Sequence, residues 1–412
     1  MTTTLKTVPV LDNAAEAFHV ARDYAESIRE GAGLRDRKGT PPYDELRALA
    51  QTGLLGINIP RAYGGAGVAI SEVIDVIRIL ASVDSSIAQT VQSHFTSIDR
   101  LRVMGPEHLR RRLYPRILAG ERLSNASAER GGKSAASFVT RINRQTDGSY
   151  LIEGRKYYTT GALTSQWIAV RALSDDNRLA TAYVPRDTPG IQIDDDWHGF
   201  GQRSTTSGTA TFTAVRVPAE LVDFLPYHGP ESDINKALAF LTHGAIETGI
   251  AENALHDGTD FVRTKARPHA EIITEGGADV VAEDLLVQAQ LGRLATSTHA
   301  ARAMVLRAAE IIDAVHATGD YNVDNVGEAL IAVSEAKAFA AEVALETSTA
   351  VIGLVGASAT DLKHALDRHW RNARTHSVHD SLTWKYVQAG RYLLTGEAPN
   401  WAPFTAPEAQ AK

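Results

Sequence analysis

Apolar residues recur every three to four positions in the first part of the chain, for example at Val73, Val76, Ile77 and Leu80. This period is typical of helices with one buried face. A proline and three glycines interrupt it within residues 57–67 and predict a break between helices. We therefore predict an N-terminal helical domain over residues 1–121.

The pattern changes after about residue 124 to short runs rich in β-branched and aromatic residues, at 149–152, 167–170, 181–184 and 209–212. Turn dipeptides such as Asp147-Gly148 and Pro189-Gly190 separate these runs. Short strands between turns indicate a small antiparallel sheet or barrel. We assign it to residues 122–228.

A helical period returns in the last part of the chain. Met304, Ala308, Ile311 and Val315 are spaced by four, three and four positions, and residues 336–350 are rich in alanine. Small side chains allow close packing of helices, so we predict a helical bundle over residues 229–398. Residues 399–412 are expected to be a tail.

Composition excludes several classes of function. The chain has 412 residues, too many for one ordinary core, and a formal net charge of −7 without a basic tract. Nucleic-acid binding is therefore disfavoured. The absence of cysteine excludes disulfides, iron–sulfur clusters, thiolate zinc sites and cysteine nucleophiles.

The chain shows no targeting pattern that we can identify. Residues 1–10 lack a basic region followed by an apolar run, so we expect no signal peptide. We find no run of eighteen apolar residues and expect no membrane span. A cytoplasmic enzyme is the resulting expectation.

Residues 371–380, Arg-Asn-Ala-Arg-Thr-His-Ser-Val-His-Asp, concentrate ionisable groups. His376 lies three positions before His379 and four before Asp380, so these side chains share one face of a helix. Imidazoles titrate near neutral pH. A buried pair can therefore move protons or hydrogen-bond a polar ring.

Three interpretations of this block stay open. The arginines can be solvated while the histidines are hydrogen-bonded core groups. A metal site of His376, His379 and Asp380 has suitable ligand types, although Arg371 and Arg374 would repel a cation. The same arginines suit a phosphate or an anionic ring.

Three further segments are suggestive but individually weak. Residues 124–132 combine small polar side chains with glycines. The segment is therefore either a place where the backbone can approach a flat heterocycle closely or a plain turn. Residues 153–162 contain two threonines followed by a glycine at 159–161. This segment suits a hairpin, or a strand end at which a threonine hydroxyl bonds a ligand. Within residues 196–208, Trp197 suits stacking on an aromatic ligand or a place in the core.

The order and spacing of these segments resemble the acyl-CoA dehydrogenase superfamily across nearly the whole chain. The matching segments are residues 60–65, 154–161, 201–207, 215–218 and 370–374. The resemblance implies an α+β fold with an N-terminal helical domain, a middle antiparallel β-barrel and a C-terminal four-helix bundle. It also implies a flavin between barrel and bundle.

Within the superfamily the chain resembles the flavin-dependent monooxygenases typified by dibenzothiophene monooxygenases, and the sulfur-acquisition oxidoreductases linked to alkyl sulfone use. The segments are residues 195–203, 266–268, 371–380 and 384–386. This implies a two-component homotetrameric enzyme with reduced FMN supplied by an NAD(P)H-dependent flavin reductase; FAD is the alternative cofactor. Oxygen would form a C4a-hydroperoxyflavin that oxygenates a small organosulfur substrate.

The resemblance implies catalytic roles for His379, in oxygen activation, and for Thr160 and Asn125, at the C4a–N5 edge of the flavin. Arg267 is expected to reach the flavin phosphate of a neighbouring subunit. The other expected flavin contacts are Ser127, Thr159, Trp197, Ser207 and His376. Gln89 and Ser93 replace a histidine and a tyrosine of dibenzothiophene monooxygenase, and with the retained His94 they are expected to line a different substrate pocket.

The resemblance also identifies a departure from the dehydrogenases. Their catalytic glutamate falls at Asp380, whose shorter side chain would reach the substrate Cα poorly. Two alternatives to the monooxygenase stay open. One is a dehydrogenase-like FAD enzyme that oxidises an acyl thioester, because one fold carries both chemistries. The other is a non-catalytic flavin-binding protein.

Overall fold

The computed structural model describes residues 8–131, 138–224, 229–276 and 278–399; residues 400–412 of the expected tail lie outside this range. The helices of the first part are α1 (Ala14–Lys38), α2 (Tyr43–Leu49), α3 (Ile70–Ala81), α4 (Ser85–Val103) and α5 (Glu107–Leu118). The strands are β1 (Leu123–Ala126), β2 (Arg141–Arg144), β3 (Tyr150–Lys156), β4 (Trp167–Leu173), β5 (Leu179–Pro185), β6 (Ile191–Ile193), β7 (Ala210–Val217) and β8 (Val222–Asp223).

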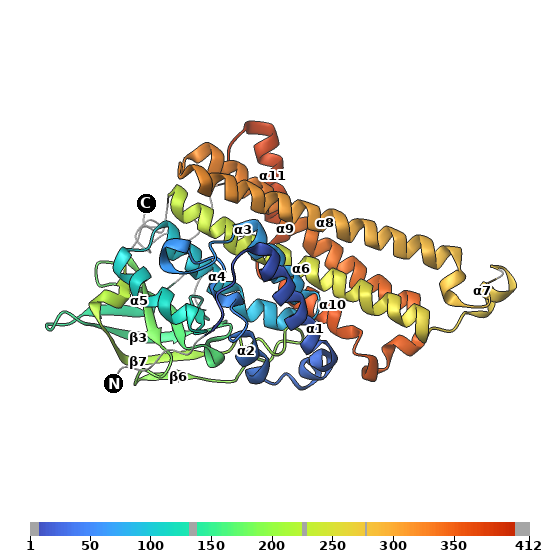
Figure 1. Cartoon of the computed structure of the whole chain (residues 1–412), viewed down its shortest axis with the longest axis horizontal. Coiled ribbons are helices and arrows are strands. Elements are labelled where there is room, and N and C mark those ends of the chain that lie inside the picture. Colours follow the sequence, from blue (N-terminus) through green and yellow to red (C-terminus); the bar gives the residue numbers. More distant parts are fainter. Residues whose placement is uncertain (1–7, 132–137, 225–228, 277, 400–412) are drawn as a thin grey trace.

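The second helical part follows the strands. Its helices are α6 (Pro230–Thr264), α7 (Ala270–Thr274), α8 (Leu285–Thr318), α9 (Val323–Val355), α10 (Asp367–Ser377) and α11 (Leu382–Thr395). Short 3-10 helices are η1 (Leu54–Gly56), η2 (Arg61–Tyr63), η3 (Ala162–Thr164), η4 (Ala219–Leu221), η5 (Val281–Glu283), η6 (Ala357–Thr360) and η7 (Leu362–His364). Figure 1 shows the sheet at one end of the molecule and the long helices α6, α8 and α9 running away from it.

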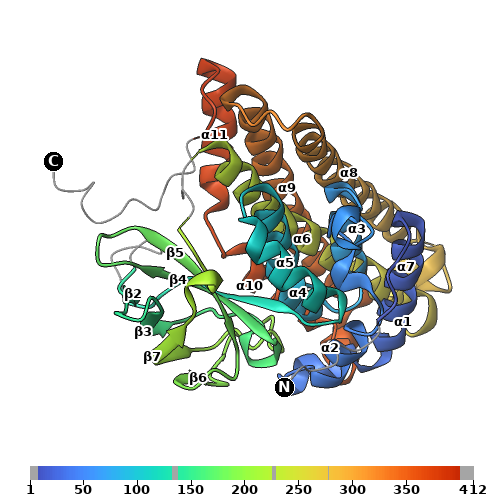
Figure 2. The same ribbon diagram turned by 60° about the vertical axis from the view of Figure 1, so that its left-hand side comes forward.

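The strands form one curled sheet in the order β6-β7-β3-β2-β4-β5-β8, with β1 beside β4. Most neighbours are antiparallel, but β4 pairs in parallel with β1 and with β2. Figure 2 shows this sheet curling beside the helices. The predicted α+β fold with a middle barrel and a helical bundle is therefore confirmed.

Helix α4 is positioned by charge as well as by its apolar face. The Asp84 carboxylate caps it by accepting the backbone N–H groups of Ser86 and Ile87 at 3.1 and 3.3 Å. The same carboxylate accepts a hydrogen bond of 2.9 Å from Nε of Arg35 on α1. The start of α4 is thereby tied to the first helix.

Among the described residues, α9 is the one helix long and apolar enough to cross a membrane. Half of its most apolar window is buried within the protein. It packs against α6, α8, α10 and α11. Its apolar composition is therefore explained by its place at the centre of the bundle.

The N-terminal helices and the bundle meet closely where α3 crosses α6. A Cβ at Gly249 of α6 would lie 2.5 Å from Cβ of Ala81 and 2.7 Å from the carbonyl oxygen of Arg78. Only glycine fits there without movement of one helix.

We predict that Gly249→Ala lowers the free energy of unfolding by about 1–3 kcal/mol, because α3 or α6 must shift. Gly292→Ala is the matched control, since this exposed glycine inside α8 has open space around its Cα. The control should raise stability by about 0.5–1 kcal/mol through helix propensity. Urea unfolding of both variants measures the difference; equal effects would contradict the packing argument.

Candidate active site between the barrel and the bundle

Arg371 on α10 joins three parts of the chain. Its Nη1 donates to the carbonyl oxygen of Phe200 in the barrel at 2.9 Å, its Nη2 pairs with Asp36 on α1, and its Nε donates to Asp367 at 2.7 Å. Its donors are thus committed to protein groups. Arg371 holds the fold together at this point, in contrast to the solvated or phosphate-binding arginine considered from the sequence.

The neighbouring residues of α10 seat the barrel loop 199–208. The side-chain oxygen of Asn372 accepts the backbone N–H of Gln202 at 2.7 Å. Gly201 lies against the carbonyl oxygen of Arg371, where a Cβ would overlap it. Any residue larger than glycine at 201 would push the barrel off α10.

Three histidines gather at the end of α10. Nδ1 of His243, on α6, lies 3.0 Å from Nε2 of His376. The ring of His379 stacks on the ring of His243, with centroids 4.0 Å apart and planes at 29°. The sequence placed His376 and His379 together but did not single out His243, because only tertiary packing brings α6 beside α10.

These imidazoles are neutral at neutral pH. Burial, followed by the neighbouring histidines and Lys337, holds the pKa values of His243 and His376 well below their usual value. The surrounding protein and then Lys337 also lower the pKa of His379. The ring of His379 nevertheless keeps an open side, which faces a cavity.

Asp380 is paired with two lysines. Its carboxylate contacts Nζ of Lys337, on α9, and lies 3.1 Å from Nζ of Lys385, on α11. Burial would raise the pKa of Asp380, but the two ammonium groups outweigh it and bring the pKa to about 2. Burial lowers the pKa of Lys337 to about 8, while Asp380 opposes the shift. Asp380 is consequently a weak base.

Glu247 lies one turn after His243 on α6 and is 1 % exposed. Neither of its carboxylate oxygens has a hydrogen-bond partner among the described residues. Burial raises its pKa well above the usual value, against the opposing effect of Lys337. Burial therefore favours the uncharged form of this acid, and the sequence did not single it out.

The barrel supplies a wall of hydroxyl groups. The hydroxyls of Thr160 and Ser207 lie 2.8 Å apart, and the hydroxyl of Thr159 donates to the carbonyl oxygen of Gly208 at 2.9 Å. Positive φ angles occur at Tyr158, Gln202 and Thr206, on either side of this wall. Backbone strain of this kind concentrates at functional sites.

A cavity of about 460 Å³ lies between α4, the barrel, α6 and the segment that follows α10. Of the residues predicted from the sequence, Ser93, Asn125, Ser127 and His379 line it. Residues outside its lining are Gln89, His94, Thr159, Thr160, Trp197, Ser207, Arg267 and His376. His376 contacts two residues that line the cavity, His243 through its ring and His379 through its carbonyl oxygen.

His94 has a different role in this structure. Its Nδ1 accepts the backbone N–H of Leu123 at 3.0 Å, so its Nε2 carries the proton and donates to the carbonyl oxygen of Leu55 at 2.8 Å. The residue is fully buried. His94 therefore ties α4 to β1 and η1.

Trp197 and Arg267 also lie away from the cavity. Nε1 of Trp197 donates to the carbonyl oxygen of Gln202 at 2.9 Å, and its ring meets Tyr158 edge-on. Arg267 is exposed beyond the end of α6.

The residues between barrel and bundle fit a flavin. Buried polar atoms without a partner among the described residues include Oδ1 of Asn125, Oγ of Ser93, both amide atoms of Gln202, Oγ1 of Thr206 and Oγ1 of Thr375. Buried polar groups are normally hydrogen-bonded, so this concentration indicates a missing polar partner. The carbonyl and ring-nitrogen groups of an isoalloxazine supply both acceptors and donors.

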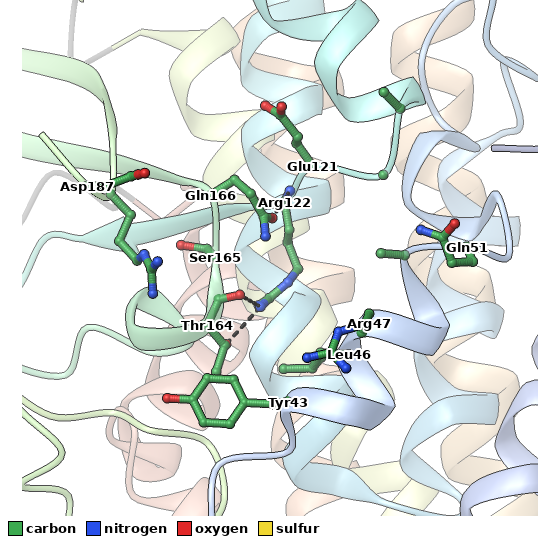
Figure 3. Close-up of a pocket in the computed structure, with 14 residues that line it drawn as sticks. Tyr43, Leu46, Arg47, Gln51, Glu121, Arg122, Thr164, Ser165, Gln166 and Asp187 are labelled. Atoms are coloured by element: carbon green, nitrogen blue, oxygen red, sulfur yellow. Dashed lines mark hydrogen bonds between the residues drawn. The ribbon is translucent and has the colours of Figure 1, made fainter. Parts of the chain in front are cut away.

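A second cavity, of about 590 Å³, lies between α2 and the barrel (Figure 3). Arg122 is one of the residues that line this cavity, and it is 3 % exposed. Its Nη2 donates to the carbonyl and hydroxyl oxygens of Thr164 at 2.7 and 2.8 Å. None of the residues predicted as site residues lines this cavity. In the part of the chain that the structure describes, no group of histidine and carboxylate side chains is arranged to hold a metal ion.

Comparison with known proteins agrees with this architecture. Three family models, described as the N-terminal, middle and C-terminal domains of acyl-CoA dehydrogenase, match residues 15–121, 125–215 and 241–384. Methanesulfinate monooxygenase MsuC from Pseudomonas fluorescens is 30% identical, with a TM-score of 0.87 and coverage of 94% of this chain and 99% of MsuC. The chain belongs to the acyl-CoA dehydrogenase family.

Two more relatives place it beside monooxygenases of this family, as the sequence predicted. The probable FMNH2-dependent monooxygenase SfnC from Pseudomonas putida is 29% identical over 400 residues, or 95% of this chain and 98% of SfnC. The dibenzothiophene monooxygenase TdsC from Paenibacillus sp. A11-2, solved with FMN and indole, is 26% identical. It has a TM-score of 0.88 and covers 94% of this chain and 100% of its own.

Burial of the neutral His94 ring makes the free energy of unfolding depend on pH. Burial lowers its pKa to about 4, below the usual value near 6.5. Between these two values the unfolded chain binds a proton that the folded chain does not. The stabilising contribution of neutral His94 is therefore fully present above the unfolded-state pKa near 6.5. It is lost as the pH falls toward the folded-state pKa of about 4.

We predict that His94→Gln reduces the loss of unfolding free energy between pH 7 and pH 5 by roughly 1–2 kcal/mol, whatever its effect at pH 7. Urea unfolding of variant and parent without flavin at both pH values measures this slope. An unchanged slope would show that folding does not alter the pKa of His94, which would contradict the burial argument.

Proposed function

We propose that this member of the acyl-CoA dehydrogenase family is a monooxygenase that uses reduced FMN and dioxygen to oxygenate a small organosulfur compound. The proposal is supported by MsuC, SfnC and TdsC, whose names give monooxygenase activity and, for SfnC and TdsC, reduced or bound FMN. A separate NAD(P)H-dependent flavin reductase supplies the reduced cofactor, and both proteins act in the cytoplasm.

One observation carries the proposal over the dehydrogenase alternative. The resemblance to dehydrogenases aligns Asp380 with their catalytic glutamate, and the pairing of Asp380 with Lys337 and Lys385 makes it a poor base. Beside it, the neutral ring of His379 opens on the cavity. The site can handle a proton through an imidazole but cannot readily remove one from carbon.

A flavin would be held between the barrel hydroxyls of Thr159, Thr160 and Ser207 and the histidines of the bundle. Reduced flavin supplies the electrons that activate dioxygen. Thr160 and Asn125 would hold the flavin by hydrogen bonds, and Ser127, Thr159 and Ser207 would support that contact. The barrel and α10 exclude water from this interface.

His379 would hold or move a proton at its ring nitrogen during oxygen activation. Its ring is held by stacking on His243, which in turn shares a hydrogen bond with His376. Only one proton can occupy the line between His243 and His376, so their tautomers are coupled. The pair keeps the ring of His379 in one orientation without placing a second positive charge beside it.

We predict that His379→Ala binds reduced FMN but lowers oxygenated product per reduced flavin by roughly two to four orders of magnitude. Hydrogen peroxide should replace the product, because the proton is no longer controlled. Asp380→Asn should lose stability, since Lys337 and Lys385 lose a charged partner. Its folded fraction should still form most of the oxygenated product per reduced flavin that the parent forms.

The dehydrogenase alternative predicts the opposite order, with Asp380 essential as the base. Product and peroxide are therefore measured for both variants on one substrate, together with turnover of an acyl-CoA. Full coupling in His379→Ala, or acyl-CoA oxidation that Asp380→Asn abolishes, would refute the proposed function.

Arg267 serves a flavin in another subunit. Thr264, the last residue of α6, lies 21 residues after His243, roughly 32 Å at the rise of an α-helix. Figure 1 shows this end of α6 beside α7, remote from the barrel. Arg267 therefore cannot reach the flavin site of its own chain.

We infer a homotetramer in which this arginine reaches the flavin phosphate of a neighbour. Large apolar side chains exposed on the bundle support an assembly, notably Leu285, Leu286, Leu393 and Leu394, each at least 77% exposed.

We predict that Arg267→Ala weakens reduced-FMN binding by roughly ten- to hundredfold, the effect of losing one charge-assisted hydrogen bond to phosphate. Arg263→Ala, which removes an exposed arginine from the last turn of α6, is the matched control and should bind normally. Sedimentation checks the assembly. A monomer that binds reduced FMN at full affinity would reject both the tetramer and the role of Arg267.

A further inference from the structure

The cavity beside His379 is lined by an excess of positive charge. Four cationic side chains border it, Arg100, Arg171, Lys236 and Lys385, against one carboxylate, Asp380. Asp380 is already shared by Lys385 and Lys337. The remaining cations come from α4, β4 and α6, so three separate elements direct positive charge to one space.

Arg100 on α4 is the most informative of these groups. It is only 8 % exposed, and its Nε has no hydrogen-bond partner among the described residues. The carboxylate of Asp223 lies 3.8 Å from Nη2 of Arg100, which is longer than a hydrogen bond. A buried guanidinium keeps its charge, so it offers a donor that an anion can use.

Lys236 shows that the cations act on one another. Burial lowers the pKa of Lys236, and Arg171 and Arg100 lower it further. Asp233, which lies 2.8 Å from Nζ of Lys236, opposes this shift but does not cancel it. Repulsion of this kind between Lys236, Arg171 and Arg100 requires that they lie close together. An anion between them would relieve it.

The other lining groups also suit a small polar ligand. From α4, Gln92, Ser93, Thr96 and Ser97 face the cavity, and Oγ of Ser93 has no partner among the described residues. A fused aromatic thioether would leave Oγ of Ser93 and Nε of Arg100 without a hydrogen-bond partner, which disfavours its binding. The lining therefore distinguishes between the two kinds of substrate named for the relatives, an aromatic heterocycle and a small acid.

We propose that the substrate is a small alkanesulfinate whose anionic oxygens are bound by Arg100 and Lys236. This rests on the proposed monooxygenase function and specifies its substrate. A sulfinate combines a negative charge with a lone pair on sulfur that can accept oxygen. A sulfonate has the charge but no such lone pair, and a sulfoxide has the lone pair but no charge.

The reaction balances with the cofactor and oxygen already named. One oxygen atom of O2 forms a new S–O bond, converting R–SO2⁻ to R–SO3⁻, and the other leaves as water. The sulfur loses two electrons. Reduced FMN supplies two electrons and two protons and becomes oxidised FMN. The charge of the substrate is unchanged, so the same cations hold substrate and product.

The test compares two substrates of equal alkyl length, propane-1-sulfinate and the neutral methyl propyl sulfoxide, with reduced FMN supplied by a flavin reductase. We expect kcat/KM for the sulfinate to exceed that for the sulfoxide by at least tenfold. Arg100→Gln should raise KM for the sulfinate by roughly ten- to hundredfold, as expected for loss of a charge-assisted hydrogen bond. It should leave KM for the sulfoxide and the affinity for reduced FMN unchanged.

Two further variants keep the result interpretable. Lys236→Gln should act in the same direction as Arg100→Gln if loss of Arg100 prevents folding. Arg144→Gln removes an equal charge from an exposed position on β2 and should leave both substrates unaffected. This control separates a local contact from a change in net charge.

Preference for the sulfoxide, or an equal effect of Arg100→Gln on both substrates, would overturn the sulfinate assignment and leave the monooxygenase function standing. Oxidation of reduced flavin to peroxide with no oxygenation of either compound would instead refute the monooxygenase function itself. The failure of one proposal is thus distinguishable from the failure of the other.

Discussion

The contact between α10 and the barrel is the constraint on which the site depends. Arg371 bonds to α1, to the barrel loop and to its own helix, while Oδ1 of Asn372 accepts the backbone N–H of Gln202. Gly201 lets the two backbones touch. A junction of this kind has little freedom to shift, because a shift would break its hydrogen bonds and its close packing. The histidines at the end of α10 are fixed relative to the barrel hydroxyls by this junction.

Burial then decides the charge of each group. Away from water, the charged form of an imidazole is disfavoured, so His243 and His376 are neutral. The same penalty favours the uncharged form of Glu247, whose carboxylate oxygens have no hydrogen-bond partner among the described residues. Asp380 escapes it because two lysines compensate its charge. The cavity is therefore bordered by the neutral ring of His243 and by the cationic side chains of Arg100, Arg171, Lys236 and Lys385.

The family fold alone does not decide between dehydrogenation and oxygenation. A dehydrogenase needs a carboxylate that can take a proton from carbon, and such a group must be free to change its charge. Pairing with two ammonium groups removes that freedom from Asp380. A change in the partners of one side chain is therefore enough to favour another reaction on the same scaffold.

The sequence by itself determined the order of the domains and the class of fold, because hydrophobic periods of about 3.6 and 2 are local properties. It also identified the block at residues 371–380, since a dense run of arginines and histidines is visible without a fold, and Ser93, Asn125, Ser127 and His379 do line one cavity. Their chemical roles stay predictions.

Only the tertiary structure decided which groups are partners. It brought His243 onto His379, placed two lysines on Asp380 and turned Arg100 into the cavity, from helices far apart in the chain. It also gave Arg371 and His94 structural bonds that their residue types do not reveal. Spacing along one chain specifies a helix face, whereas partners, burial and hence charge depend on what another element presents to that face.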